Sequence, residues 1–138
     1  ESLEAAKDAG TAFVFMGQGT AHVAKVNYSQ MQTQMQNLGY ENVFIGTVEG
    51  EPEETSAEAV IEAVKAAGYT NVVLRPLMVV AGDHANNDMA GSDDDSWKTV
   101  FEAAGFTVDC QIHGLGEIAD VQALYVAHTK AAIDALNA

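Results

Sequence analysis

The sequence has few basic residues and no long apolar run. Lysine and arginine number 6, against 20 aspartate and glutamate residues, so the formal net charge is −14. The basic residues occur singly, whereas proteins that bind nucleic acid gather them in clusters. The longest uncharged apolar runs, such as Leu77–Ala81, are far too short to cross a bilayer. We therefore expect no nucleic-acid partner and no insertion into a membrane.

Cysteine is equally scarce, and no export signal is visible. The one cysteine, Cys110, cannot form an internal disulfide, which excludes a disulfide scaffold and a zinc knuckle. Its strand-like neighbours predict a buried thiol. No basic segment with a cleavage site opens the chain, so we expect a cytoplasmic protein. Because the first residue is Glu1 rather than methionine, the alternative is a periplasmic protein whose signal peptide precedes Glu1.

What the sequence does contain is a repeated unit of one helix and one strand. A length of 138 residues, with 48% apolar and 19% charged residues, is typical of one globular domain. Gly10, Gly39, Gly68 and Gly105 each follow a helical pattern and precede an apolar, β-branched run. Glycine at the end of a helix adopts the left-handed conformation without a steric penalty. The repeat predicts an α/β fold with right-handed crossovers.

The apolar pattern divides the chain into strands and helices. The strands are continuous apolar runs, as expected when both faces of a parallel sheet are covered. We predict a three-layer open parallel sheet of four strands in the order 2-1-3-4, with helices on both faces, and residues 1–138 forming a single lobe. The predicted strands are Ala12–Met16, Val43–Val48, Val72–Val79 and Thr107–Ile112. The predicted helices include one whose apolar stripe contains Tyr28, Met31 and Met35, and a final helix over Ala119–Leu136.

Polar loops follow the predicted strands at the edge where open α/β sheets bind ligands. The first loop, Gly17–His22, places two glycines before a helix and could bind a phosphate group. It matches neither G-x-G-x-x-G nor the Walker A sequence. We favour a tight turn with Thr20 as the N-cap of the next helix, and we expect no nucleotide cofactor. A flavodoxin-like module for a nucleotide or flavin has support from this loop alone.

Glu49 and His84 follow the second and third strands and could form a metal-binding pair. A borderline cation such as Co²⁺, Ni²⁺, Fe²⁺ or Zn²⁺ accepts one carboxylate and one imidazole. From spacing alone, a solvated glutamate and a histidine with local hydrogen bonds are the more frequent arrangement. His22 could face either the cleft or the solvent. Met78 and Met89 flank the His84 loop and could line an apolar pocket.

Three segments carry a resemblance to a known family. The longest runs from Arg75 to Ala90, includes the string Ala-Gly-Asp-His and continues through Asp94–Lys98. The second is Gly114–Glu117, and the third is Phe15–Gly19. Together they resemble the sirohydrochlorin cobaltochelatases of the anaerobic cobalamin pathway, which are class II tetrapyrrole chelatases; Phe15–Gly19 is similar to their Met-Gly-His-Gly turn. The resemblance covers nearly all of this chain but only the C-terminal half of the two-lobed enzyme.

The resemblance implies a second lobe and a metal site. Two similar α/β lobes would hold a tetrapyrrole between them, with an N-terminal lobe ahead of Glu1 and residues 1–10 ending the helix between the lobes. The family holds its metal with two histidines and a glutamate. The glutamate corresponds to Glu49 and one histidine to His84, whereas Gln18 occupies the place of the other histidine. The residues expected to contact the substrate are Gly17, Gly19, Met78, Ala81, Gly82 and Met89.

The implied function is insertion of Co²⁺, with Ni²⁺ or Fe²⁺ as alternatives, into sirohydrochlorin, with Glu49 and His84 as the catalytic residues. Gln18 offers only a neutral amide oxygen and no base. Either fewer protein ligands hold the metal, or His22 substitutes for the absent histidine, or this copy is impaired or altered. The alternative function is a carrier of haem or metal on the same scaffold. A homo-oligomer is compatible with both.

Overall fold

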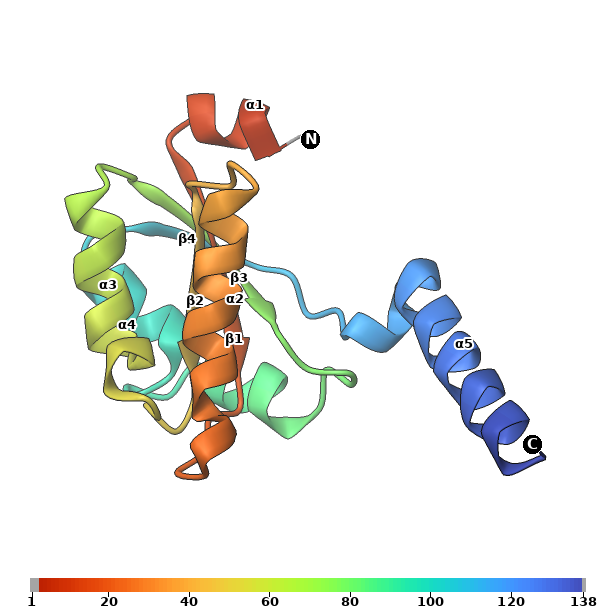
Figure 1. Cartoon of the computed structure of the whole chain (residues 1–138). Helices are drawn as coiled ribbons and strands as arrows, with labels where there is room; N and C mark the ends of the chain where they lie inside the picture. Colours follow the sequence, from red (N-terminus) through yellow and green to blue (C-terminus); the bar gives the residue numbers. More distant parts are fainter. Residues whose placement is uncertain (1–2, 138) are drawn as a thin grey trace.

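The computed structural model describes residues 3–137 and contains one four-stranded sheet in which every strand pair is parallel. The strand order is β2-β1-β3-β4, which confirms the predicted fold class and order. In Figure 1 the sheet lies between α3 and α4 on one side and α5 on the other. The strands are β1 (Thr11–Gly17), β2 (Val43–Thr47), β3 (Asn71–Pro76) and β4 (Thr107–Cys110). The helices are α1 (Leu3–Asp8), α2 (Val26–Asn37), α3 (Ala57–Ala66), α4 (Trp97–Ala103) and α5 (Ala119–Leu136).

Four short helical turns, η1 to η4, lie in the loops between these elements. Their bounds are η1 (Val23–Lys25), η2 (Glu53–Thr55), η3 (His84–Met89) and η4 (Leu115–Glu117). The predicted helix ends are confirmed, because the repeated glycines all have positive φ angles: 70° at Gly10, 86° at Gly39, 83° at Gly68 and 99° at Gly105. Glu1 and Ser2, which the sequence analysis assigned to an inter-lobe helix, lie outside the described residues.

β3 and β4 end earlier than the apolar runs predicted, at Pro76 and Cys110. For β3 the reason is that β1 ends at Gly17, and its last hydrogen bond to this side runs from the Leu77 N–H to the Met16 carbonyl, at 2.8 Å. The chain beyond Leu77 therefore has no strand β1 to pair with. Its carbonyl groups at positions 78 and 79 accept hydrogen bonds from residues 115 and 116, in the segment after β4.

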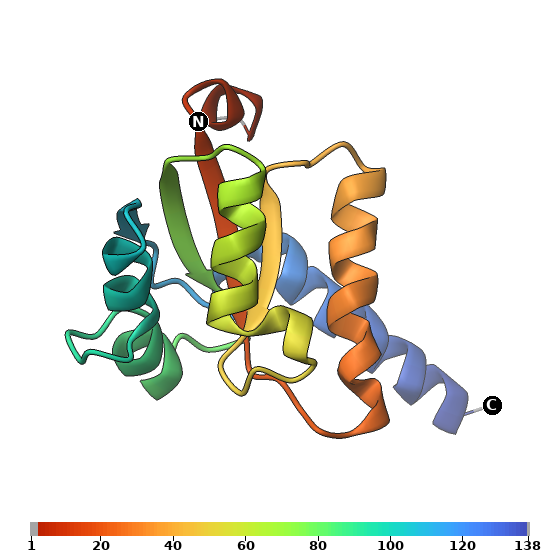
Figure 2. The same ribbon diagram turned by 90° about the vertical axis from the view of Figure 1, so that its left-hand side faces the viewer.

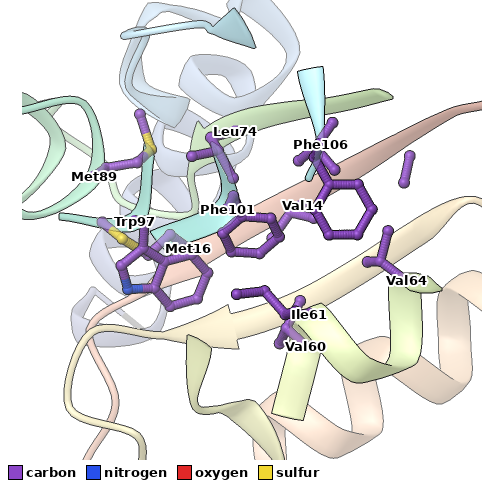
Figure 3. Packing of buried hydrophobic residues seen from close by; sticks show 12 residues of the cluster. Val14, Met16, Val60, Ile61, Val64, Leu74, Met89, Trp97, Phe101 and Phe106 are labelled. Atoms are coloured by element: carbon purple, nitrogen blue, oxygen red, sulfur yellow. The ribbon is translucent and has the colours of Figure 1, made fainter. Parts of the chain in front are cut away.

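The core fills the face of the sheet that α3 and α4 cover, as Figure 3 shows. Val14, Met16 and Leu74 of the sheet and Phe101 of α4 are completely buried there. Trp97 stacks on Phe101 with its ring centroid 5.8 Å away. Burial of one side chain of this size stabilises the fold by about 1.5–3 kcal/mol. This face therefore supplies most of the apolar stabilisation of the lobe.

α2 follows the outer edge of β2, and a polar side chain of α2 forms hydrogen bonds with the strand there. The Gln32 side chain donates a hydrogen bond to the Val43 carbonyl and accepts one from the Ile45 N–H, both at 2.8 Å. The amide thus satisfies backbone groups that an edge strand would otherwise leave unpaired. Met31 and Met35, which lie in the predicted apolar stripe of this helix and were expected to pack in the core, are only half-buried, so that expectation was wrong.

α5 lies on the opposite side of the sheet from α3 and stands away from it (Figure 2). Every residue of α5 is exposed except Val121, which is half-buried. Phe13 and Phe15, whose side chains lie on this face of β1, are likewise only half-buried. Within residues 3–137, no helix is both long and apolar enough to span a membrane. The sheet is therefore closely packed on the face that α3 and α4 cover. On the opposite face Val43 and Ile45 of β2 are buried, whereas Phe13 and Phe15 of β1 beside them are only half-buried.

Candidate metal centre at the carboxyl edge of the sheet

The loops after β1 and β2 bring two of the predicted ligand positions into contact. Parallel pairing places the ends of both strands at one edge, and the register sets Gly17 beside Thr47. The pairing continues into the loops, where the Glu49 N–H donates to the Gln18 carbonyl at 3.0 Å. The Gln18 side-chain amide then donates to a Glu49 carboxylate oxygen, also at 3.0 Å. The amide holds one side of the carboxylate, and the second oxygen has no bond to Gln18.

The glycines of the first loop permit this close approach. Gly19 has a φ angle of +89°, and a Cβ there would lie 2.9 Å from the Cβ of Glu49 and 3.0 Å from the Cβ of Thr47. Its N–H donates to the Tyr28 hydroxyl at 3.0 Å. A Cβ on Gly17 would lie 2.6 Å from the Tyr28 ring. Both glycines were predicted to contact substrate. The structure gives a separate reason for glycine at each position, because a Cβ at Gly19 would collide with Glu49 and one at Gly17 would collide with Tyr28.

His22 caps η1 through its ring. Its Nδ1 accepts a hydrogen bond from the Ala24 N–H at 3.1 Å, while the Thr20 hydroxyl accepts one from the His22 N–H. The predicted N-cap at Thr20 was therefore wrong by two residues. The Thr20 hydroxyl bonds to the backbone of His22, and His22 is the residue that caps the helical turn. A neutral ring whose Nδ1 accepts carries its proton on Nε2. His22 would have to change tautomer and lose the cap before Nε2 could bind a metal.

His84 begins the π-helical turn η3, which directs its ring by a local contact. Its Nδ1 lies 2.5 Å from a carboxylate oxygen of Asp88, four residues later. A carboxylate on one ring nitrogen fixes the ring and makes the other nitrogen a stronger metal ligand. Asp88 was not among the predicted site residues, although the spacing of four residues between His84 and this aspartate is a signal that the sequence contains.

The remainder of the Arg75–Ala90 segment supports this turn. Asn86 donates to the Gly82 carbonyl at 2.8 Å, and Asn87 donates to an Asp83 carboxylate oxygen at 2.6 Å. Met89 is completely buried in the core, so it attaches the turn to the core and does not line the open pocket that had been predicted. Met78 is half-buried against the same core, whereas Ala81 is half-buried and Gly82 exposed at the edge. Met78, Ala81 and Gly82 are therefore the predicted substrate contacts of this segment that keep exposed surface.

A second histidine–carboxylate pair lies after β4. His113 Nδ1 lies 2.9 Å from a Glu117 oxygen, and the other Glu117 oxygen accepts from the Gly114 N–H at 2.8 Å. The hydrogen bond with His113, then that with Gly114, lowers the pKa of the Glu117 carboxyl, and the charge of Arg75 adds to this effect. Within residues 3–137, no three His, Cys, Asp or Glu side chains are close enough together to hold a metal ion. Glu49 and His84 therefore do not form a complete protein cage by themselves.

Comparison with known proteins identifies a matching family and two relatives. The model of one family, described as cobalt chelatase (CbiK), matches residues 1–134. A sirohydrochlorin cobaltochelatase from Salmonella typhimurium is 41% identical over 121 residues, which are 88% of this chain and 44% of that protein. Sirohydrochlorin cobaltochelatase CbiKC from Nitratidesulfovibrio vulgaris is 33% identical over 135 residues, 98% of this chain and 46% of that protein. The chain thus spans somewhat less than half the length of these relatives.

A solved structure shares the fold at much lower identity. It is described as a cobalamin (vitamin B12) biosynthesis CbiX protein from Marinobacter aquaeolei VT8, and it superposes with a TM-score of 0.67 at 15% identity. The match covers 90% of this chain and 98% of that one. At this identity the likeness shows the fold alone.

Proposed function

The chain belongs to the cobalt chelatase (CbiK) family, and on this premise we propose that its carboxyl sheet edge inserts Co²⁺ into sirohydrochlorin. The observation that carries the proposal is the geometry of this edge. Glu49 is held by Gln18 after the β1–β2 pair, and His84 is held by Asp88 after β3. Both residues stand at the positions that the resemblance assigns to metal ligands. The tetrapyrrole would lie over this edge, between this lobe and a second α/β lobe.

Glu49 and His84 suit an ion that must be delivered and released. One carboxylate and one imidazole satisfy a borderline divalent cation without enclosing it. Several coordination positions then stay open for the pyrrole nitrogens, which have to replace the remaining ligands. Co²⁺ is the metal we propose, and competition with Ni²⁺ and Fe²⁺ in the same assay tests that choice.

Insertion also requires removal of two protons. As the pyrrole nitrogens bind the ion, two N–H bonds break, their electron pairs form the metal–nitrogen bonds, and the protons leave for a base and then for solvent. Once its nitrogen is released from the ion, the His84 ring has a free lone pair that can accept one of these protons. Asp88 would stabilise the resulting imidazolium, because its carboxylate already lies beside Nδ1. Gln18 can do neither, since an amide is not a base at this pH.

The test is an insertion assay with the complete protein and matched histidine variants. Glu49→Ala and His84→Ala should each slow the absorbance change that accompanies insertion by at least ~100-fold, beyond what removal of an outer-shell partner costs. His113→Ala is the control, because His113 has the same type of carboxylate partner four residues away but is not assigned to the ion. Wild-type rates in both ligand variants, or an equal loss in His113→Ala, would refute the proposal.

The second candidate is a carrier of haem or of metal, and the Gln18–Glu49 hydrogen bond favours it. That bond occupies one carboxylate oxygen and replaces a basic ligand with a neutral amide. A carrier would bind one equivalent of the metal or of haem per chain but would not convert sirohydrochlorin. Titration with Co²⁺ and with haem measures binding. Addition of sirohydrochlorin to the Co²⁺-loaded protein then measures turnover.

A further inference from the structure

Two buried threonine hydroxyls lie at the ends of the turn that carries Glu49. The buried polar side chains among residues 3–137 are those of Asn42, Thr47, Thr55 and Ser96. Thr47 and Thr55 contact each other, with 2.7 Å between their Oγ1 atoms, and they are only 1% and 3% exposed. Burying a hydroxyl costs free energy unless it is hydrogen-bonded. The further partners of these two hydroxyls therefore show what the pair holds in place.

The hydrogens of this pair have one consistent arrangement, because the Thr55 hydroxyl donates its single hydrogen to the Pro52 carbonyl, at 2.6 Å. The hydrogen between the two threonines must then come from Thr47. With its own hydrogen used, the Thr47 oxygen accepts from the Glu51 N–H at 3.1 Å. The Glu51 carbonyl lies 3.5 Å from the same hydroxyl, too far to compete for that hydrogen. The chain thus runs in one direction, from the Glu51 N–H through both hydroxyls to the Pro52 carbonyl.

Thr47 closes the turn on which Glu49 stands. Its carbonyl accepts from the Gly50 N–H at 3.2 Å, and its hydroxyl accepts from the Glu51 N–H. Glu49 lies between these points, two residues after Thr47, so the two bonds fix the direction in which its side chain leaves the backbone. Thr55 contributes by keeping the hydrogen of Thr47 turned away from the Glu51 N–H.

Glu51 joins this turn to the loop that carries Gln18. Its carbonyl accepts from the Thr20 N–H at 3.3 Å, and its carboxylate lies 3.0 Å from the Lys25 Nζ. Both side chains of the ion pair are more than a third exposed, and such pairs contribute little stability on their own. The backbone groups of Glu51 are therefore the main connection between the buried hydroxyls and the first loop.

We propose that Thr47 and Thr55 are positioning residues for Glu49, whose carboxylate their hydroxyl pair holds toward the carboxyl edge of the sheet. The inference deepens the proposed function and rests on it for the role of Glu49. Valine has nearly the shape of threonine, so apolar packing alone does not account for hydroxyls at both positions. What the hydroxyls add is direction, because each one fixes a backbone group of the turn. Loss of one hydroxyl should therefore weaken metal binding without removing a ligand.

The first experiment follows amide hydrogen exchange by NMR in the metal-free, complete protein. Thr47→Val keeps the branched shape but removes the acceptor of the Glu51 N–H. The Glu49 and Glu51 amides should exchange at least ~10-fold faster than in the wild type, because the turn opens locally. Thr47→Ser retains the hydroxyl and should restore the wild-type rates. Unchanged rates in Thr47→Val would overturn the inference.

The second experiment measures Co²⁺ affinity of the same variants by calorimetric titration. Thr47→Val and Thr55→Val should each bind Co²⁺ about tenfold more weakly, the lower end of what loss of an outer-shell partner costs. Thr47→Ser should bind as the wild type does. Asn42→Ala is the control, because Asn42 is 2% exposed but bonds to the Thr11 carbonyl at the opposite edge of the sheet. It should lower stability and leave the affinity unchanged, and an equal loss of affinity there would overturn the inference.

Glu49→Ala, titrated alongside, separates failure of this inference from failure of the proposed function. If Glu49→Ala binds Co²⁺ as tightly as the wild type, the proposed function is refuted, and the exchange rates alone decide whether the hydroxyls hold the turn. If Glu49→Ala loses affinity and Thr47→Val does not, Glu49 keeps its proposed role and positioning by Thr47 is refuted.

Discussion

The two sides of the candidate site are built by different means. On the β1–β2 side, Gln18 and Glu49 are 31 residues apart in the chain and meet only because the parallel register aligns their loops. On the β3 side, His84 and Asp88 are four residues apart and meet within a single helical turn. The first pair depends on the sheet and the second on local backbone geometry. A change to the sheet edge should therefore affect Glu49 first, and a change to η3 should affect His84 alone.

The largest expected effect comes from the local pair. Asp88→Ala removes the carboxylate that orients the His84 ring, so Co²⁺ affinity should fall about 10–100-fold. Asp83→Ala is the control, because Asp83 lies in the same turn and contacts Asn87 instead of His84. Calorimetric titration of Co²⁺ measures both variants. Equal affinities for Asp88→Ala and the wild type would show that the turn positions His84 without Asp88.

On the other side, Gly19→Ala tests how closely the first loop must approach Glu49. Gly39→Ala is the control, because Gly39 has nearly the same φ, +86° against +89°, and a Cβ there meets no atom within 4 Å. The left-handed conformation should cost each variant about 1–2 kcal/mol of unfolding free energy. Contact with Glu49 and Thr47 should cost Gly19→Ala about 1–3 kcal/mol more. Equal losses in denaturant unfolding would mean that the loop yields without strain.

Gln18→His would convert the β1–β2 side to the ligand set of the family. An imidazole is a better donor than an amide for Co²⁺, so affinity should rise about tenfold at about pH 8. The gain should largely disappear at about pH 6, because protonation of the new histidine competes with the metal. Titration at both pH values measures the difference. An unchanged affinity at both would place Gln18 outside the coordination shell.

The smallest expected effect concerns the second histidine–carboxylate pair. Removing the ring in His113→Ala takes away the main cause of the low Glu117 pKa, so that pKa should rise toward its ordinary value. A lowered folded-state pKa stabilises the fold above the unfolded pKa, and this contribution is lost as the pH falls through the folded value. The variant should therefore lose less stability on acidification. A ¹³C titration of the Glu117 carboxyl in both proteins measures the change directly, and an unchanged pKa would contradict the assigned cause.

The elements that the sequence predicted well are those set by local or repeated patterns. The glycines after the helices and the span of α5 follow from the repeat and from periodicity, and the structure confirms them, as it confirms the expected strand order. The end of β3 depends on where β1 stops, which no local pattern records. Gln32 was missed for a related reason, since a polar side chain that pairs with a strand edge resembles any exposed glutamine in the sequence. The outward course of α5 likewise follows from backbone contacts between distant segments.

The candidate site divides in the same way. Glu49 and His84 were nominated by their places after the second and third strands, and Gln18 by the resemblance of its turn to a known family; the roles of all three as ligands are still predictions. Contact between Gln18 and Glu49 could be expected from the shared sheet edge, and the structure shows it. The capping role of His22 could not, because it requires the backbone conformation after Thr20.

The central claim is that both sides of the edge act on one ion, and a double-mutant cycle on Co²⁺ binding tests it most directly. The complete protein, Glu49→Ala, His84→Ala and the double variant are titrated under identical conditions. We expect one ion per site in the wild type, a loss of at least ~10-fold in either single variant, and a double variant little weaker than the worse single one, because the two ligands are coupled through the ion. Two ions in the wild type, with each single variant still binding one at undiminished affinity, would show that Glu49 and His84 belong to separate sites.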